Sequence, residues 1–420
     1  MAAHIVPSPP VLSQAARNAV LAAAFFGLVF DGIELGLMPV ASLSVSQSLL
    51  GADYTKEAGG QWFAWFTAAL MLGAAIGGSL LGNLGDRVGR ARAMGVSILF
   101  YSLFAGMGAF VDTCEHMLLL RFLVGLGVGG MWPNGVALVA ECWPNTSRPT
   151  VSGILGAGIN VGIVCLSLLG TVHPITPDSW RWIFKLAAVP AVLGIVVLTL
   201  LPESPKWLAS RGPERNQVKK PAPPLRMLFR GELLWLTLIG ILLASVPLVG
   251  AWAGSKWMLP WADQVGGATH AGYKSTTQWW WAIGATIGSF LGAPLAASIG
   301  RRLSYFLISL GATLLTWAMF RWTAPLEPSF LPTVFAQGLV ATLFFGWLPL
   351  YLPELFPVEV RATGAGISMN IGRFVTAISI LMIGSQFKGD YAEIGAACAL
   401  IYALGMIIVF WAPNTAGKSL

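Results

Sequence analysis

The stretch Glu141-Cys-Trp-Pro-Asn-Thr-Ser-Arg148 is matched later in the chain by Glu354-Leu-Phe-Pro-Val-Glu-Val-Arg361. Both stretches read E-x-x-P-x-x-x-R, and both follow an apolar run of membrane-spanning length. The two copies lie 213 residues apart (354 minus 141), which is about half of the 420-residue chain. A charged motif that repeats at the ends of equivalent hydrophobic segments indicates a chain built from two copies of one multi-helix unit.

Composition sets the class of protein. Apolar residues make up 56% of the chain and charged residues 10%, and the mean hydropathy is +0.72. Soluble domains are about a quarter charged, so we predict an all-α, multi-pass integral membrane protein. Twelve transmembrane helices are expected, because twelve apolar stretches come near the roughly 20 residues that cross a bilayer core. They are 17–42, 61–83, 91–111, 117–141, 150–172, 182–201, 232–258, 276–299, 303–320, 330–352, 362–385 and 391–412.

The placement of positive charge predicts the topology. A net charge of +7 would suggest nucleic acid in a soluble chain, but here Lys and Arg gather in the connections after the even-numbered spans. By the positive-inside rule, both termini and the middle loop are then cytoplasmic. We expect the membrane to be the plasma (inner) membrane. We expect no nucleic-acid partner. The basic middle loop is either a solvated linker or a contact to anionic lipid headgroups.

The middle loop divides the chain into two six-helix bundles. Their predicted bounds are 1–201 and 231–420, with a cytoplasmic linker at 202–230. In the linker, Ser204 can cap a helix whose first position is Pro205, so we expect a short amphipathic helix that ends near Gly212. The two bundles are predicted to be pseudo-symmetric copies.

Four motifs carry a resemblance to a known family. The first is Gly82-Asn-Leu-Gly-Asp-Arg-Val-Gly-Arg90, and the second is Arg121-Phe-Leu-Val-Gly-Leu-Gly-Val-Gly-Gly130. Pro202-Glu-Ser-Pro-Lys-Trp-Leu208 follows the sixth span, and the E-x-x-P-x-x-x-R pair completes the set. In this order the motifs resemble the major facilitator superfamily, in the branch of sugar porters, organic ion transporters and aromatic-acid:proton symporters. The resemblance implies the major facilitator fold over the whole chain.

The resemblance also implies a cytoplasmic gate. Charged residues of the repeated motifs would form ion pairs between the two bundles, and these pairs would close the cytoplasmic side when the protein faces outward. Each exposed pair is worth about 0 to 1 kcal/mol, so several are needed to bias the equilibrium. The other interpretation is that these charges only set topology and solvate loops. The gate residues are Asp86, Arg90, Glu141, Arg148, Glu203, Arg301, Glu354 and Arg361.

Four charges are clear cases of ionisable groups embedded in the membrane: Asp31, Glu34, Arg121 and Arg373. Such groups cost about 2.5 to 3.5 kcal/mol at the bilayer centre, so they normally face a cavity or a partner. Asp31 and Glu34 share one helical face, and the depth of Arg121 permits it to meet Glu34. Asp31-Gly-Ile-Glu34 is similar to the D-G-x-D element of aromatic-acid symporters. Asp31, Glu34 and Arg121 are therefore predicted to couple transport to protons. A permanent Glu34–Arg121 ion pair is the alternative.

The substrate site is expected between the two bundles, near the membrane midplane. Arg373 can bind a planar carboxylate with two parallel hydrogen bonds. The seventh span lacks the paired glutamines of sugar porters, and few hydroxyl partners are available. These features favour a small, flat or apolar carboxylate. The predicted substrate-binding residues are Trp132, Asn134, Asn160, Trp252, Gln278, Trp280, Trp347, Tyr351, Asn370 and Arg373.

The leading functional hypothesis is proton-coupled symport of a small organic anion, an aromatic or other monocarboxylate, by alternating access. The proton gradient would drive it, without a cofactor. The four cysteines form no C-x-x-C pair, so no metal is expected. We expect a monomer and no enzymatic activity. The alternatives are export of organic cations or drugs by proton antiport, a sugar or metabolite facilitator, and a non-transporting sensor.

Overall fold

The computed structural model describes residues 12–143, 148–209, 225–357, 360–386 and 389–415. Within these ranges there is no strand, and twelve helical segments are long and apolar enough to cross a membrane. The predicted all-α fold with twelve spans is thereby confirmed. The first six spans are α1 (Gln14–Leu50), α2 (Lys56–Val88), α3 (Arg90–Met107), α4 (Cys114–Cys142), α5 (Arg148–Val172), and α6 (Arg181–Ala187) with α7 (Ala191–Leu200). The last six are α9 (Gly231–Val249) with α10 (Met258–Gly266), α11 (Tyr273–Ile299), α12 (Arg301–Arg321), α13 (Phe330–Glu354), α14 (Arg361–Ser385) and α15 (Tyr391–Ile408).

The first helix is longer than its hydropathy predicts. Ser13 caps α1, because its hydroxyl accepts a hydrogen bond from a backbone N–H of the first turn. The prediction ended this span at residue 42, where a run of serines begins. In the structure the Ser46 hydroxyl donates to the Ser42 carbonyl oxygen at 2.8 Å, which satisfies a polar side chain without leaving the helix. The helix therefore continues to Leu50.

Glycines allow the same close packing in two pairs of helices. A methyl group on Gly77 of α2 would overlap the Leu126 carbonyl of α4. A methyl group on Gly288 of α11 would overlap the Leu339 carbonyl of α13 in the same way. These are the second and fourth spans of each half of the chain, so the two halves share a packing solution as well as a sequence motif.

The seventh span is broken. Pro247 near the end of α9 has no N–H to donate to the Leu243 carbonyl, and the Tyr305 hydroxyl donates to that carbonyl instead, at 2.9 Å. The chain then passes through a π-helix, η5 (Gly250–Gly254), and a 3-10 turn, η6 (Ser255–Trp257), before α10. Such interruptions often lie at functional sites.

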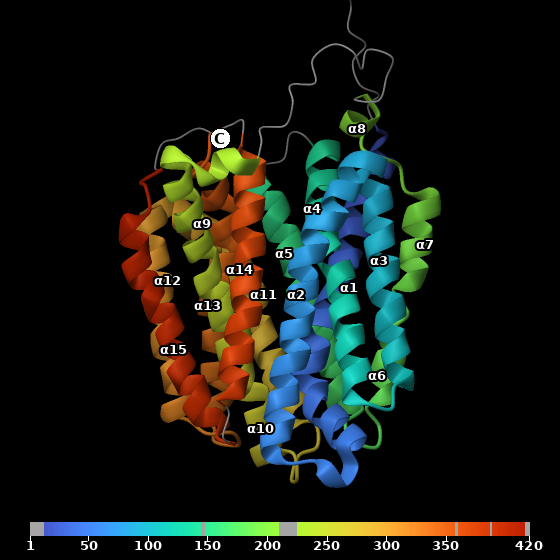
Figure 1. Cartoon of the computed structure of the whole chain (residues 1–420), viewed down its shortest axis with the longest axis vertical. Coiled ribbons are helices and arrows are strands. Elements are labelled where there is room, and N and C mark those ends of the chain that lie inside the picture. Colours follow the sequence, from blue (N-terminus) through green and yellow to red (C-terminus); the bar gives the residue numbers. More distant parts are fainter. Residues whose placement is uncertain (1–11, 144–147, 210–224, 358–359, 387–388, 416–420) are drawn as a thin grey trace, which may run out of the picture.

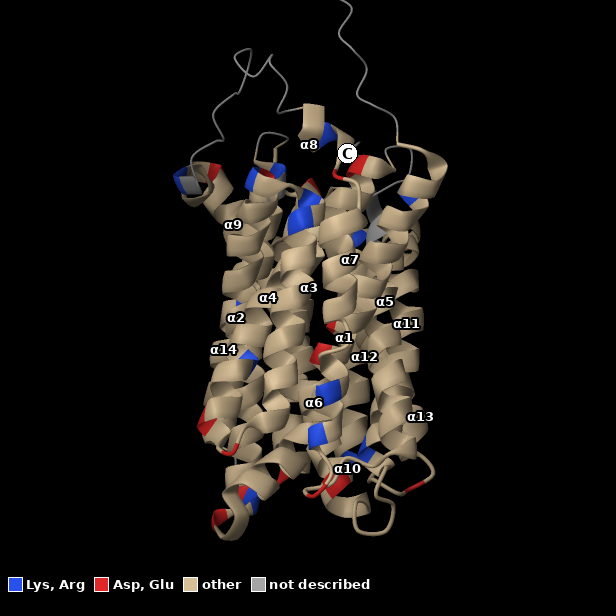
Figure 2. Ribbon diagram, turned by 90° about the vertical axis from the view of Figure 1, so that its right-hand side faces the viewer, with Lys and Arg blue, Asp and Glu red and all other residues tan. Residues whose placement is uncertain are grey.

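The helices form two groups that stand side by side (Figure 1). We call α1–α7 the first bundle and α9–α15 the second bundle. Helix pairs α5–α11 and α2–α14 pack across the boundary between them. The short helix α8 (Pro205–Ala209) lies at one end of the molecule, here called the linker end, and α10 lies at the far end. Charged residues gather at both ends, with few between them (Figure 2).

The linker begins as its sequence predicts. The Ser204 hydroxyl accepts from the Trp207 N–H at 3.2 Å and so caps α8. The Trp207 indole N–H then donates to the Asp86 carbonyl oxygen at 3.1 Å, which docks α8 on the end of α2. The predicted end of this helix near Gly212 lies outside the described residues.

Candidate functional site

The centre of the candidate site is a buried ion pair in the first bundle. Glu34 of α1 and Arg121 of α4 are both 0% exposed, and Arg121 Nη1 lies 3.5 Å from Glu34 Oε2. The guanidinium also lies over the ring of Phe184, with 5.4 Å to the ring centroid. The structure thus brings together two of the three residues that the sequence assigns to proton coupling.

This pair is incompletely satisfied. Among the described residues, Glu34 Oε1 and both Nε and Nη2 of Arg121 have no hydrogen-bond partner. Buried charged groups normally use all their hydrogen-bonding atoms, because each one left without a partner costs free energy. A structural tie between α1 and α4 would be expected to satisfy them. These unpartnered hydrogen-bonding atoms favour a pair that rearranges during function.

Asp31 extends the cluster to the second bundle. It is 2% exposed, its Oδ1 has no hydrogen-bond partner among the described residues, and it interacts electrostatically with Arg373 of α14 and with Glu34. Tyr101 of α3 interacts electrostatically with both carboxylates, while its hydroxyl donates to the Gly27 carbonyl at 3.2 Å. The sequence did not predict that Arg373 would face an acid of the other bundle.

Arg373 makes only long bonds in its own surroundings. Its Nη1 donates to the Ala74 carbonyl of α2 and to Asn370 Oδ1, both at 3.4 Å. The amide nitrogen of Asn370 donates to Ser79 of α2 at 3.2 Å. The predicted site residues Asn370 and Arg373 therefore lie on the α2–α14 side of the boundary between the bundles.

Two further predicted residues lie on the opposite side of that boundary. Asn160 of α5 donates to the Ser289 hydroxyl of α11 at 2.9 Å. Gln278 of α11 donates to the Gly36 carbonyl of α1 at 3.1 Å, and its Oε1 has no partner among the described residues. The boundary is thus lined on both sides by side chains that the sequence singled out.

Three further residues predicted to bind substrate have their contacts within a single bundle in this conformation. Asn134 donates to two backbone carbonyls of the first bundle, at 2.8 and 3.0 Å. Trp347 donates to the Arg301 carbonyl at 2.9 Å and stacks on Tyr351, whose hydroxyl donates to the Pro413 carbonyl. All three side chains are 0% exposed. They join helices of one bundle. The position of a residue in a span predicts its depth in the membrane, but not the face of the helix on which it lies.

The remaining predicted aromatic residues are half-buried. Trp132 of α4 packs beside Gly156 of α5. Trp280 of α11 stacks on its neighbour Trp279 and meets Phe335 of α13 edge-on, so it contributes to packing in the second bundle. Trp252 lies in the π-helix that interrupts the seventh span.

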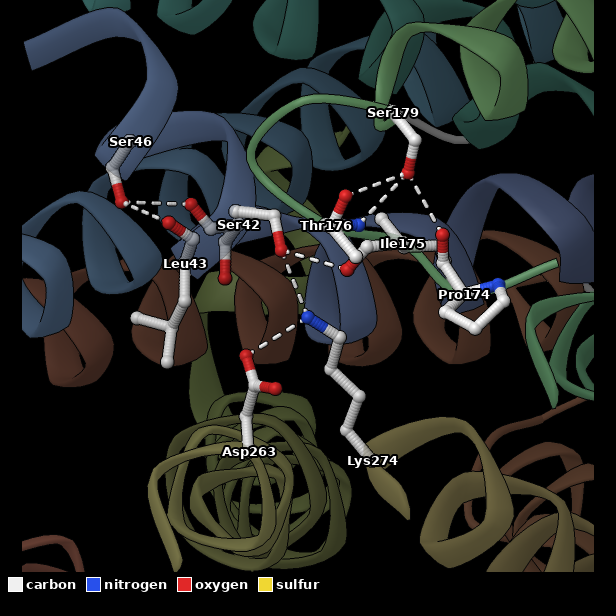
Figure 3. A network of polar contacts seen from close by, with 10 residues as sticks. Ser42, Leu43, Ser46, Pro174, Ile175, Thr176, Ser179, Asp263 and Lys274 are labelled. Atoms are coloured by element: carbon white, nitrogen blue, oxygen red, sulfur yellow. Dashed lines mark hydrogen bonds and ion pairs between the residues drawn. The ribbon is translucent and has the colours of Figure 1, made fainter. Parts of the chain in front are cut away.

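At the far end a polar network crosses between the bundles (Figure 3). Lys274 of α11 pairs with Asp263 of α10, with 2.8 Å between Nζ and Oδ2. The same ammonium donates to the Ser44 hydroxyl of α1 at 2.9 Å, and Ser44 donates to the Ile175 carbonyl at 2.9 Å. Nearby, the rings of Phe63 and Trp257 also meet across the boundary. Neither Lys274 nor Asp263 is among the residues singled out from the sequence, so this network was not predicted.

At the linker end the charges of the first bundle bond within that bundle. Arg90 pairs with Asp86 and lies 3.9 Å from Glu141. Glu141 accepts a hydrogen bond from the Ser204 hydroxyl. Glu203 accepts from the first backbone N–H groups of α3, at 3.0 Å for the shortest.

The second bundle repeats this pattern. Glu354 accepts from Arg301 Nη2 at 2.7 Å and from the Thr415 hydroxyl at 2.5 Å. The Arg361 guanidinium lies 3.5 Å from a backbone carbonyl of its own bundle, and the side chain of Arg148 lies outside the described residues. Every ion pair within the described ranges joins two residues of the same bundle. The predicted pairs between bundles are thus not formed in this conformation by the described gate residues.

The sequence motifs, the twelve spans and the two bundles have a counterpart among known proteins. The family model for the Major Facilitator Superfamily matches residues 19–380. The chain belongs to this superfamily. A Cupriavidus pinatubonensis protein named "Probable 4-methylmuconolactone transporter" is 29% identical, over 84% of this chain and 81% of its own. The cis,cis-muconate transport protein of Acinetobacter baylyi is 28% identical, over 91% and 92%.

A solved structure shows the same fold. The partially occluded inward-open conformation of the xylose transporter XylE from E. coli superposes with a TM-score of 0.76 at 18% identity, over 97% of this chain and 100% of that one. With the family and the named relatives, which are transporters, this Major Facilitator protein is a membrane transporter and not an enzyme.

Proposed function

We propose that this Major Facilitator protein is a secondary active transporter that carries a small organic anion together with a proton. The observation that carries the proposal is the buried cluster of Asp31, Glu34, Arg121 and Arg373, which has members in both bundles and leaves hydrogen-bonding atoms unused. The named relatives support an organic acid as substrate, since muconate is a flat, conjugated carboxylate. The proton gradient supplies the free energy, without a cofactor.

Glu34 is the proposed proton carrier. Its ionised form is stabilised by Arg121 at 3.5 Å, and a buried carboxylate without a cation is costly. If movement of α1 relative to α4 separates the pair, the neutral acid becomes the favoured form and Glu34 takes up a proton. Asp31 acts beside it as a second acid that connects this step to Arg373.

Arg373 is the proposed partner of the substrate carboxylate near the centre. Its two long hydrogen bonds leave most of the guanidinium free to bind an anion. Asp31 then competes with the substrate for the same positive charge. Asn160, Gln278, Asn370 and Trp252 are the further groups that we assign to the path, because they lie at the boundary between the bundles or at the break in the seventh span.

The arrangement of polar contacts favours an inward-facing state. The far end is tied across the bundles by Lys274, whereas the described gate charges at the linker end bond within their own bundles. We assign the far end to the outside and the termini to the cytoplasm of the plasma membrane, in a monomer whose bundles, 1–201 and 231–420, rock about the central cluster. In the outward-facing state the gate residues, Asp86, Arg90, Glu141, Arg148, Glu203, Arg301, Glu354 and Arg361, would pair between bundles.

Replacing Glu34 tests the coupling. Glu34→Gln should abolish uptake of benzoate against its gradient in proteoliposomes, while exchange of internal for external benzoate continues, because glutamine imitates the protonated acid. Glu115→Gln, at an exposed acid of α4, is the control and should accumulate benzoate normally. Accumulation by the Glu34→Gln variant at the wild-type level would remove Glu34 from the mechanism and leave a permanent ion pair as its role.

A further inference from the structure

Lys256 is a buried cation that the central cluster does not use. It lies in η6, directly after the π-helix of the broken seventh span, and is 1% exposed. No hydrogen-bond acceptor among the described residues lies within reach of its ammonium. Lys256 lies near the end of the predicted seventh span, 232–258, and has no role among the sequence-based predictions.

Two tryptophan rings surround the ammonium. Its Nζ lies 3.5 Å from the ring centroid of Trp281 in α11 and 5.9 Å from that of Trp252 in η5. Cation–π contacts of this kind are worth about 2 kcal/mol when desolvated, which is less than the several kcal/mol that burial of an ion costs. Gln278 lies one turn from Trp281, and its Oε1 is a second polar atom without a hydrogen-bond partner among the described residues. The rings alone do not explain why this charge is retained.

A count of the buried charges isolates Lys256. In the central cluster, the negative charges of Asp31 and Glu34 balance the positive charges of Arg121 and Arg373. Lys274 is balanced by Asp263. Lys256 forms no ion pair with any described residue. With all of these groups ionised, the described interior holds one positive charge in excess, which a single carboxylate would neutralise.

We propose that Lys256 is the loading site for the substrate anion: its ammonium binds a carboxylate, and the faces of Trp252 and Trp281 hold the flat apolar body. This inference rests on the proposed transport of an organic anion. Lys256 would provide a binding position for the anion that lies outside the central cluster.

The position of Lys256 fits a loading role. It follows Gly231, the first residue of α9, by 25 residues, and Arg373 follows Arg361, the first residue of α14, by 12. At 1.5 Å per residue, Lys256 lies roughly 38 Å from the linker end and Arg373 roughly 18 Å. Lys256 is thus closer to the far end, which the Lys274 network closes in this state. An anion that enters from the far end would meet Lys256 before Arg373.

The test compares Lys256→Met, which keeps the volume, with Lys256→Arg, which keeps the charge. In proteoliposomes, Lys256→Met should raise the KM for benzoate uptake from the far side by about 10- to 100-fold, the equivalent of one charge-assisted hydrogen bond. The maximal rate should change less than about threefold, because translocation uses the central cluster. Lys256→Arg and the exposed-residue control Lys185→Met should keep a KM near that of the wild type.

Melting temperature separates recognition from a structural role. Without ligand, Lys256→Met should melt at a higher temperature than the wild type, because the variant no longer buries an uncompensated charge. A lysine whose function is to pack on Trp281 would give a lower melting temperature. A lower melting temperature, or an unchanged KM, would overturn the proposal.

Binding by the purified protein keeps the two proposals distinguishable. Benzoate should quench tryptophan fluorescence in the wild type and in Lys256→Arg, but at about 10-fold or higher concentration in Lys256→Met, and neutral benzamide should bind all three equally weakly. If this pattern holds while a proton gradient drives no uptake, the loading site stands and the proposed symport falls. Equal benzoate binding by wild type and Lys256→Met, or no benzoate binding by the wild type, would refute the loading site.

Discussion

Asp31 and Arg373 define the charge balance at the centre of the molecule. They belong to different bundles and interact electrostatically, yet they form no ion pair within 4.0 Å. Within the described part of the chain, Arg373 also has no short hydrogen bond. In such a loose pair, a substrate carboxylate can replace Asp31 beside Arg373. The loss in free energy is small, because no short hydrogen bond between Asp31 and Arg373 has to break.

Replacing Arg373 and replacing Asp31 should therefore have opposite effects on the affinity for the anion. Arg373→Ala should weaken benzoate binding by about 1.5 to 3 kcal/mol, the range for a bond to a charged group. Asp31→Asn should strengthen it, because the competing carboxylate is gone. Isothermal titration calorimetry at fixed pH, with benzamide as the neutral control, measures both. Weaker binding in both variants, for both ligands, would mean that the pair supports structure and not recognition.

At the same scale, the sequence predicted some contacts and missed others. Glu34 and Arg121 were paired correctly, since charges inside apolar spans have few partners and helix depth narrows the choice. The contact of Asp31 with Arg373 could not be predicted, because it depends on how the two bundles face each other. That Trp347 and Asn134 contact only their own bundle in this conformation could not be predicted for a related reason. Depth in the membrane is readable from residue number, but the side of the helix that faces the other bundle is not.

Among the helices, α11 connects the bundles most directly. Its first turn places Lys274 between Asp263 and Ser44, and its middle receives the hydrogen bond from Asn160. The tie to Ser44 can exist only while the far end is closed. It therefore stabilises this state relative to one in which α1 and α11 separate.

Loss of this tie should open the far end. Lys274→Met removes a buried bond from a charged donor, worth about 1.5 to 3 kcal/mol, and should raise the far-end-open population about 10- to 100-fold. Labelling of Ser42→Cys, a 1% exposed position of α1, reports the change in a background without the native cysteines. Ser329→Cys, an exposed far-end position, is the accessible control. Unchanged labelling of Ser42→Cys would show that the Lys274 network is not a gate.

Helix existence was predictable and helix detail was not. Twelve spans follow from hydropathy, because a bilayer-spanning segment must satisfy its backbone internally. The extension of α1 to Leu50 escaped prediction, since serines that bond to their own helix read as a polar boundary. The break after Pro247 escaped it too, because Tyr305, distant in sequence, compensates the lost backbone bond. The break matters most for function, because Lys256 lies in the 3-10 turn that follows it.

For the molecule as a whole, proton and substrate are coupled through the equilibrium between conformations. If protonation of Glu34 and binding of the anion favour the same state, each must strengthen the other by the same factor. In a symporter, affinity for the anion on the outside therefore rises as pH falls. In an antiporter, where proton and substrate compete, it decreases.

A pH titration of binding separates these cases. With benzenesulfonate, which stays ionised throughout, the dissociation constant should fall as pH decreases from about 8 to 5, by at most about tenfold per pH unit for one linked proton. The slope should vanish in Glu34→Gln, because its amide cannot titrate, and should persist in the Glu115→Gln control. Weaker binding at low pH would indicate an antiporter. A flat profile in the wild type, matched by a flat profile in Glu34→Gln, would favour a facilitator, because then no proton bound at the central cluster would change the balance between the inward-facing and outward-facing states.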